Sequence, residues 1–119
     1  MGELCVRWNP FLRRFILLYN GDNPFFILEH QAALPWGPWT GYQNIFDADA
    51  AFGHYIHLGG QNDGQSDPGR EGTGGGVYGP YMISRYTQPN TDGSAKMYFV
   101  LSVWNPYNTM LMSAIFRSR

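Results

Sequence analysis

Short segments of this chain alternate between apolar and polar side chains, and turn-forming residues separate one segment from the next. Alternation with a period of two over about five to nine residues is typical of antiparallel strands, and the spacing of an amphipathic helix is nearly absent. The predicted strands span residues 3–8, 14–19, 25–31, 41–46, 78–86, 97–103 and 110–116. The sequence therefore predicts an all-β fold built from antiparallel meanders.

The order of these strands divides the chain into three parts. Residues 1–46 hold one four-stranded meander, residues 47–76 form a glycine-rich connection, and residues 77–119 hold three strands of an incomplete second meander. Eight glycines fall within residues 58–76, which predicts a long loop there. Repeated four-stranded meanders are typical of the blades of a β-propeller. We therefore predict a partial β-propeller domain of about two blades.

The composition excludes several classes of protein. A chain of 119 residues is long enough for one domain, and an aromatic content of 17% excludes intrinsic disorder. Only 14% of the residues are charged, and the seven arginines and one lysine are spread along the chain. Without a clustered basic face, nucleic acid is not expected as a partner. No apolar run approaches the roughly 18 to 20 residues that span a bilayer, so no membrane partner is expected either.

The amino-terminal residues bear on processing and on redox chemistry. Glu3 lies where a signal peptide has its basic region, and no apolar stretch follows, so no signal peptide is predicted in this chain. Cys5 is the single cysteine, which excludes an internal disulfide. We expect Cys5 to pack as a small apolar residue.

Several segments resemble a known protein family. Residues Tyr78–Met82, Met97–Tyr107 and Met110–Met112 are similar to the closing blades of five-bladed β-propellers in a bacterial domain-of-unknown-function family. That family is similar to glycoside hydrolases, and some of its members are endo-D-arabinanases. Residues Glu3–Tyr19 and Pro35–Trp39 also match the blade pattern of these proteins and of related five-bladed glycosidases. The similarity covers most of the chain outside the glycine-rich loop.

This resemblance implies a five-bladed propeller of which the chain supplies fewer than two blades, as a carboxy-terminal fragment. In related glycosidases the essential carboxylates generally come from earlier blades. The resemblance therefore implies that most of the catalytic apparatus lies outside this chain. It also implies a protein that is secreted or held at the cell surface, with a polysaccharide or oligosaccharide as its partner.

Two carboxylates are the weak candidates for catalysis. Glycoside hydrolysis needs two carboxyl groups about 5 to 5.5 Å apart for retention or about 6.5 to 9.5 Å apart for inversion. Asp47 and Asp49 are two residues apart, so they would share one strand face at roughly the larger distance. The favoured alternative for them is a capping loop before a helical turn over residues 47–52. The remaining acids of this region lie in the glycine-rich loop, where nothing rigid would hold them: Asp63, Asp67 and Glu71.

No metal site and no cofactor are predicted. His54 and His57 are three residues apart, a spacing that suits a metal only on a helix, and no third ligand lies near them in the sequence. The glycines of residues 72–76 lack the lysine–serine pair and the helix that follow a phosphate-binding loop.

Aromatic residues supply the candidate binding surface. Flat rings with a polar edge are suited to stacking on the faces of sugars, and this chain has more of them than a small sheet needs. The predicted substrate-binding residues are Trp36, Trp39, Tyr78, Tyr81 and Arg85. The alternative is that such rings pack between propeller blades.

The favoured function is a fragment of a glycoside-hydrolase-like propeller protein that contributes carbohydrate-binding surface and has no appreciable catalysis alone. The alternative from another class is a non-enzymatic sugar-binding or interaction module that self-associates through open sheet edges. A structural β-sandwich unrelated to sugars is a third hypothesis.

Overall fold

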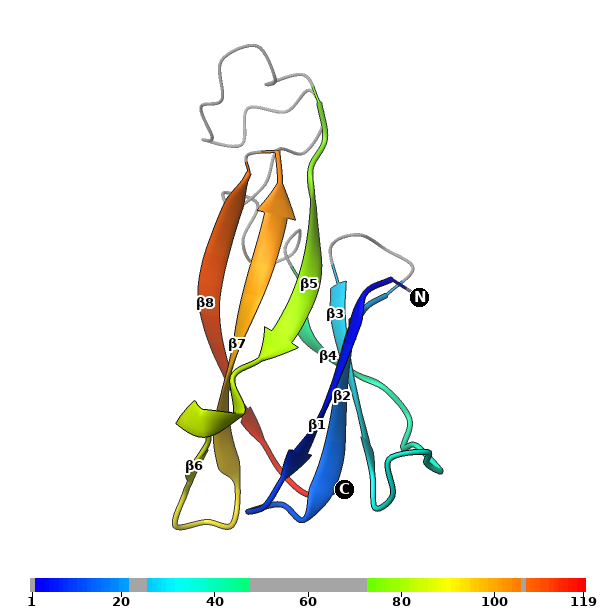
Figure 1. The fold of residues 1–119 in the computed structure, drawn as a ribbon, viewed down its shortest axis with the longest axis vertical. Coiled ribbons are helices and arrows are strands. Elements are labelled where there is room, and N and C mark those ends of the chain that lie inside the picture. The colour runs from blue at the N-terminus through cyan, green and yellow to red at the C-terminus, as the bar shows by residue number, and fades with distance from the viewer. Residues whose placement is uncertain (1, 22–25, 48–72, 106) are drawn as a thin grey trace.

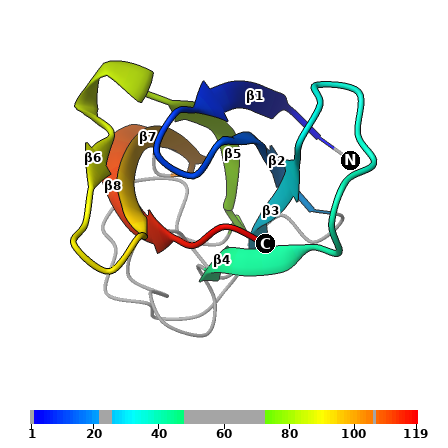
Figure 2. The same ribbon diagram turned by 90° about the horizontal axis from the view of Figure 1, so that it is seen from below.

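A computed structural model describes residues 2–21, 26–47, 73–105 and 107–119 of the chain. It contains two antiparallel β-sheets that face each other across a common core (Figure 1 and Figure 2). In sheet 1 the strands follow the order β1-β2-β3-β4. These strands are β1 (Leu4–Asn9), β2 (Arg14–Asn20), β3 (Phe26–Ala32) and β4 (Gln43–Asp47). The predicted all-β fold and its first meander are confirmed.

Sheet 2 is built around β7 (Ala95–Trp104). The strand β8 (Asn108–Phe116) pairs along one edge of β7. On the other edge, β5 (Gly76–Met82) pairs with residues 99–104 and the two-residue β6 (Gln88–Pro89) pairs with residues 95–96. The strands β5 and β6 therefore lie one after the other beside β7, so the sheet is three strands wide. The assignment of both sheets to propeller blades, and the division of the chain at residues 47 and 76, stay predictions.

The prediction of one strand over residues 78–86 is wrong at its end, because β5 stops at Met82. The N–H of Ile83 still donates to the carbonyl of Tyr98 at 2.8 Å. Beyond it, two local hydrogen bonds of 3.1 Å close the 3₁₀ turn η2 (Ser84–Tyr86). Backbone groups that bond three residues along the chain cannot join the ladder, so the strand is interrupted before β6.

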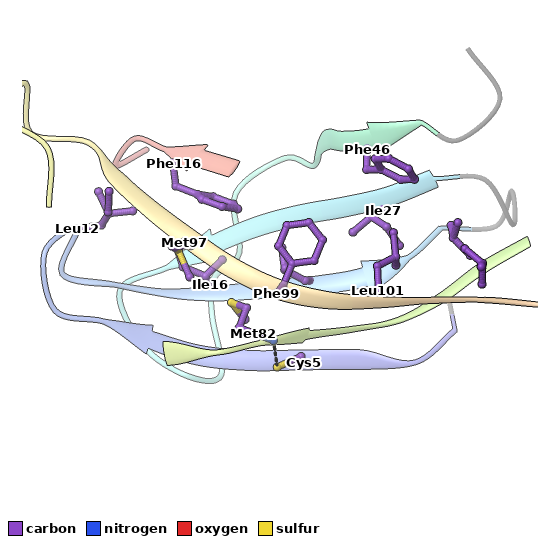
Figure 3. Packing of buried hydrophobic residues seen from close by; sticks show 14 residues of the cluster. Cys5, Leu12, Ile16, Ile27, Phe46, Met82, Met97, Phe99, Leu101 and Phe116 are labelled. Atoms are coloured by element: carbon purple, nitrogen blue, oxygen red, sulfur yellow. Dashed lines mark hydrogen bonds between the residues drawn. The ribbon is translucent and has the colours of Figure 1, made fainter. Parts of the chain in front are cut away.

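The hydrophobic core lies between the two sheets. Alternate residues of β7 point inward and are almost fully buried, as the period of two requires. Figure 3 shows them meeting side chains of sheet 1. The core comprises Cys5, Leu12, Ile16, Leu18, Ile27, Phe46, Val77, Met82, Ala95, Met97, Phe99, Leu101, Val103 and Phe116.

Cys5 joins the edges of the two sheets. Its side chain is buried, and its sulfur accepts a hydrogen bond of 3.4 Å from the backbone N–H of Met82 (Figure 3). The expectation that Cys5 packs as a small apolar residue is confirmed. This contact places β1, at the edge of sheet 1, beside β5, at the edge of sheet 2.

Buried asparagines shape two of the hairpins. Asn9, between β1 and β2, accepts hydrogen bonds of 3.0 Å from the N–H groups of Phe11 and Leu12. Its amide nitrogen also lies 3.1 Å from the sulfur of Met97 across the core. Asn105, between β7 and β8, has φ of +54° and donates to the carbonyl of Thr73. The side chain of Asn9 thus satisfies N–H groups that its own turn leaves unpaired, whereas Asn105 ties its turn to the segment before β5.

A tight turn over residues 90–93 precedes β7. The N–H of Gly93 donates to the carbonyl of Asn90 at 3.2 Å, and Gly93 has φ of +78°. Asp92 accepts hydrogen bonds from the hydroxyl and the N–H of Ser94, at 2.6 and 3.0 Å. These bonds, together with the Arg117 guanidinium at 2.7 Å, lower the pKa of Asp92 to about 2.

The carboxy-terminal residues 117–119 are tied to sheet 1. The buried Gln31 donates to the carbonyl of Arg117 at 2.7 Å and accepts from the N–H of Arg119 at 3.0 Å. The Arg119 guanidinium pairs with the buried carboxylate of Glu29, and Arg14 donates to the Arg119 carbonyl at 3.1 Å. We call the group of Arg14, Glu29, Gln31 and Arg119 the tail clamp. It connects the end of β8 to β2 and β3 (Figure 2).

In the described part of the chain, no helix is long and apolar enough to cross a membrane.

Candidate functional site

The predicted binding residues divide into two groups in the structure. Tyr78, Tyr81 and Arg85 lie on sheet 2 and the adjoining η2, whereas Trp36 and Trp39 lie in the connection between β3 and β4 of sheet 1. Figure 1 and Figure 2 both place η2 and the β3–β4 connection on different sides of the molecule. The structure therefore does not bring all five residues together.

A β-bulge aligns Tyr78 and Tyr81 on one face of sheet 2. Residues three apart in a regular strand point to opposite faces. Here Tyr78 pairs with Ser102 and Tyr81 pairs with Val100, and the register shifts between them. Ser102 and Val100 are two apart and both point outward, because the alternate residues of β7 fill the core. Tyr78 and Tyr81 therefore both point to the outer face, with Tyr81 48% exposed.

Two further tyrosines extend this surface. Tyr98 also points outward from β7, and Tyr86 of η2 meets its ring edge-on at 6.4 Å between ring centroids. The Arg85 guanidinium lies 4.7 Å above the Tyr86 ring and donates to the Tyr86 hydroxyl at 2.6 Å. We define the tyrosine face as Tyr78, Tyr81, Tyr86 and Tyr98 with Arg85.

The surroundings of the tyrosine face mix cationic, hydroxyl-bearing and apolar side chains, and the carboxylate of Glu3 lies close to Gly79 of β5. Lys96 holds its ammonium 5.1 Å from the centre of the Tyr98 ring. The other outward neighbours on β7 and β8 are apolar or hydroxyl-bearing, and no carboxylate lies among the outward side chains of β5, β7 and β8. The apolar or hydroxyl-bearing neighbours on β7 and β8 include Val100, Ser102, Thr109, Leu111 and Ser113. These strands offer ring faces, hydroxyls and hydrogen-bond donors, but no second carboxyl group to act with Glu3 as the pair that hydrolysis needs.

The tryptophan pair lies apart from this surface. Trp36 is 77% exposed, and Trp39 is half-buried in the same connection. The connection is held to β3 by Thr40, whose N–H donates to the Gln31 carbonyl at 2.8 Å and whose hydroxyl accepts from the Gln31 N–H at 2.9 Å. Trp36 is thus an exposed ring on an anchored loop, without a described aromatic partner.

Of the two candidate catalytic carboxylates, Asp47 is among the described residues and Asp49 is not. Asp47 is the last residue of β4 and pairs with Phe26. The rest of the helical turn expected over residues 47–52 lies outside the described residues, so the capping role of Asp47 stays a prediction. Asp49 lies outside the described residues, as do the acids of the glycine-rich loop and the histidines: Asp63, Asp67, Glu71, His54 and His57. Among the described residues, no group of three or more histidine, cysteine, aspartate or glutamate side chains could hold a metal ion.

Tyr86 and Tyr98 were missed by the sequence reasoning, although one signal for Tyr98 was available. Tyr98 occupies the alternate position to Met97 and Phe99, so the period of two already places it on the outer face. Tyr86 carried no comparable signal, because its position depends on the 3₁₀ turn that interrupts the predicted strand.

A family model described as a domain of unknown function, DUF4185, matches residues 1–113. The chain belongs to the DUF4185 family. This confirms the predicted membership of a domain-of-unknown-function family. No curated protein matches the sequence. The tyrosine face lies wholly within the matched residues of the DUF4185 domain, whereas Arg119 of the tail clamp lies beyond them.

Proposed function

We propose that this DUF4185 domain binds a polysaccharide or an oligosaccharide through the tyrosine face. The supporting observation is the bulge that turns Tyr78 and Tyr81 to the same side as Tyr98. Rings on one face of a sheet can stack on successive sugar units, and their hydroxyls together with Arg85 can bond to sugar hydroxyls. Hydrolysis needs two carboxyl groups, and the outward side chains of β5, β7 and β8 supply none to pair with Glu3 beside Gly79, which favours binding over hydrolysis at this face.

This proposal includes the setting in which the domain works. The domain is part of a secreted or cell-surface protein that resembles the glycoside hydrolases with a five-bladed propeller. In that protein the domain contributes sugar-binding surface, and carboxylates from elsewhere carry out any hydrolysis. The 119-residue chain therefore binds arabinan-like glycans without cleaving them.

The test compares substitutions on the two aromatic groups. Titration calorimetry with arabinan oligosaccharides measures the affinity of the original chain and of Tyr81→Ala, Tyr98→Ala and Trp36→Ala. Each tyrosine substitution is expected to weaken binding by about 2- to 12-fold, since a lost aromatic contact is worth roughly 0.5 to 1.5 kcal/mol. Trp36→Ala removes an exposed ring from the other sheet and should leave the affinity unchanged.

Three outcomes would count against the proposal. Unaltered affinity in both tyrosine variants would remove the tyrosine face as the site, and a loss confined to Trp36→Ala would move the site to the β3–β4 connection. Release of reducing sugar by the chain alone would contradict the assignment as a binding domain. Circular dichroism of each variant verifies that the fold is retained.

A further inference from the structure

The strand β8 presents an unprotected edge. Within the described part of the chain, β8 pairs with β7 on one side and with no strand on the other (Figure 1). Its nine residues include no charged residue and no proline. Natural sheets usually protect a free edge with charges, proline, a bulge or a very short strand. A long, uncharged edge of this kind is a template for pairing with another strand.

The other sheet edges differ from β8. The edge of β1 lies against β5, as the contact between Cys5 and Met82 shows. The edge strand β4 has five residues and ends at Asp47, and the register of its ladder with β3 shifts at Ile27 and Leu28. Among the described strands, β8 therefore combines the length and the lack of charge that favour pairing.

Among the described residues, the core is also less completely covered on the β8 side. The inward residues of β7 are almost fully buried, and Leu101 has no exposed surface. On β8, the inward Phe116 is buried in this core, whereas three other inward residues that pack against the core are only partly buried: Met110, Met112 and Ala114. An apolar seam thus runs along β8 where the core meets its free edge.

We propose that β8 pairs with β8 of a second copy of this chain, antiparallel and with a two-fold axis at Met112. In this register Met112 faces its own counterpart, Met110 faces Ala114, and Leu111 faces Ser113. Inward residues meet inward residues and outward residues meet outward residues, because paired residues share a sheet face. The pairing brings no like charges together, since β8 has none, and it closes the apolar seam.

The paired sheets would form one surface. A two-fold axis through an antiparallel edge pair leaves both outer faces on the same side, so the two tyrosine faces become continuous. A glycan could then contact both copies, and this consequence alone rests on the proposed function. The pairing itself is tested without any sugar.

Cysteine crosslinking tests the register. Opposed residues of an antiparallel pair have Cα atoms about 4.5 to 5.5 Å apart, within the range that a disulfide bridges. Met112→Cys is therefore expected to form a disulfide-linked dimer under mild oxidation. Ala114→Cys is the matched control on the same strand face. In the proposed register its two copies lie about 13 Å apart along the strands, too far for a disulfide. Both variants keep the buried Cys5, so any crosslinking through Cys5 would be the same in the two variants.

Charge substitutions test the pairing in solution without relying on a disulfide. Light scattering should show a dimer for the original chain. Leu111→Lys with Ser113→Lys, or Leu111→Glu with Ser113→Glu, should each give a monomer, because like charges would face each other across the axis. A mixture of the lysine and glutamate variants should restore the dimer. Phe11→Lys places a charge on an exposed residue of the β1–β2 turn and should leave the dimer intact.

Three different results would each contradict the proposed pairing of β8. A monomer at all concentrations, with slow hydrogen exchange along β8, would show that another segment of the same chain covers the edge. A monomer with fast exchange would show that the edge stays unpaired. Crosslinking of Ala114→Cys in place of Met112→Cys would reject the register. Circular dichroism of every variant shows whether the fold is intact.

Discussion

At Gly79 the backbone of β5 enters the left-handed region, with φ of +63°. An added Cβ there would lie 3.2 Å from the carboxylate of Glu3 and 3.2 Å from the ring of Tyr81. Glycine adopts this conformation without the steric cost that any other L-residue incurs. One glycine thus permits the bulge that places Tyr81 on the same face as Tyr78.

Gly79→Ala should lower the free energy of unfolding by about 1 to 2 kcal/mol, the usual cost of a left-handed L-residue. It should also weaken glycan binding, because the bulge that orients Tyr81 would be strained. Gly41→Ala is the control, since Gly41 has no positive φ and an added Cβ would meet no atom within 4 Å. Urea unfolding of both variants measures the difference. Equal stability would show that φ at Gly79 does not limit the substitution.

At the scale of the elements, the tail clamp joins the end of β8 in sheet 2 to β2 and β3 in sheet 1. Glu29 is buried in β3, and one of its carboxylate oxygens has no hydrogen-bond partner among the described residues. Its charge is compensated by Arg119, whose side chain is 32% exposed. A buried carboxylate without its cation is costly, so this ion pair resists removal of either member. The pair of Arg117 with Asp92 is much more exposed, at 66% and 49%.

Arg119→Ala should therefore destabilise the fold by about 1 to 3 kcal/mol, a value reduced from that of fully buried pairs because Arg119 is partly exposed. Arg117→Ala should cost under about 1 kcal/mol, as exposed ion pairs do. Adding Glu29→Gln to Arg119→Ala should recover part of the loss, because the uncompensated charge is then absent. Urea unfolding measures all three variants. Equal losses in the two arginine variants would argue against a special role for the buried carboxylate.

At the scale of the molecule, the two sheets share one hydrophobic core. Phe99 and Leu101 of sheet 2 belong to the same buried cluster as Ile16 and Ile27 of sheet 1 (Figure 3). Each sheet has one face that the other must cover, as layered β-proteins require. We expect the two sheets to unfold in a single cooperative transition.

Phe99→Ala should lower the free energy of unfolding by about 3 to 5 kcal/mol, the range for removing a buried phenylalanine ring. The loss should appear equally in the hydrogen exchange of β2 and β3, although Phe99 lies on β7. Phe11→Ala, which removes an exposed ring from the β1–β2 turn, should change stability by no more than about 0.5 kcal/mol. Protection of β2 and β3 that is unaffected by Phe99→Ala would mean that the sheets unfold separately.

Much of the fold could be predicted because strand signals are local. The alternation over residues 97–103 and 110–116 located β7 and β8 to within two residues at each end. Asn90 and Gly93 form the turn before β7, and both are residue types that favour turns. The predicted strand at 78–86 ended early because its last residues form hydrogen bonds with each other, which alternation does not record.

For the candidate site, the sequence predicted some of the residues but not how they are arranged. Aromatic content drew attention to Tyr78, Tyr81 and Trp36, but their faces and neighbours depend on pairing between distant strands. A bulge moved Tyr81 to the face of Tyr78, and the separation of the sheets placed Trp36 elsewhere. The match to the DUF4185 family establishes a relationship, while the placement of the rings follows from the pairing of the strands.

The sequence alone determined the all-β class, the positions of turns and the burial of Cys5, because alternation and turn chemistry act over a few residues. The tyrosine face, the tail clamp and the free edge of β8 required the assembled sheets. Gln31 and Arg119 are 88 residues apart, and Glu29 and Arg119 are 90 apart. Contacts over such separations are selected by how two complete sheets pack, and no local pattern of side chains encodes them.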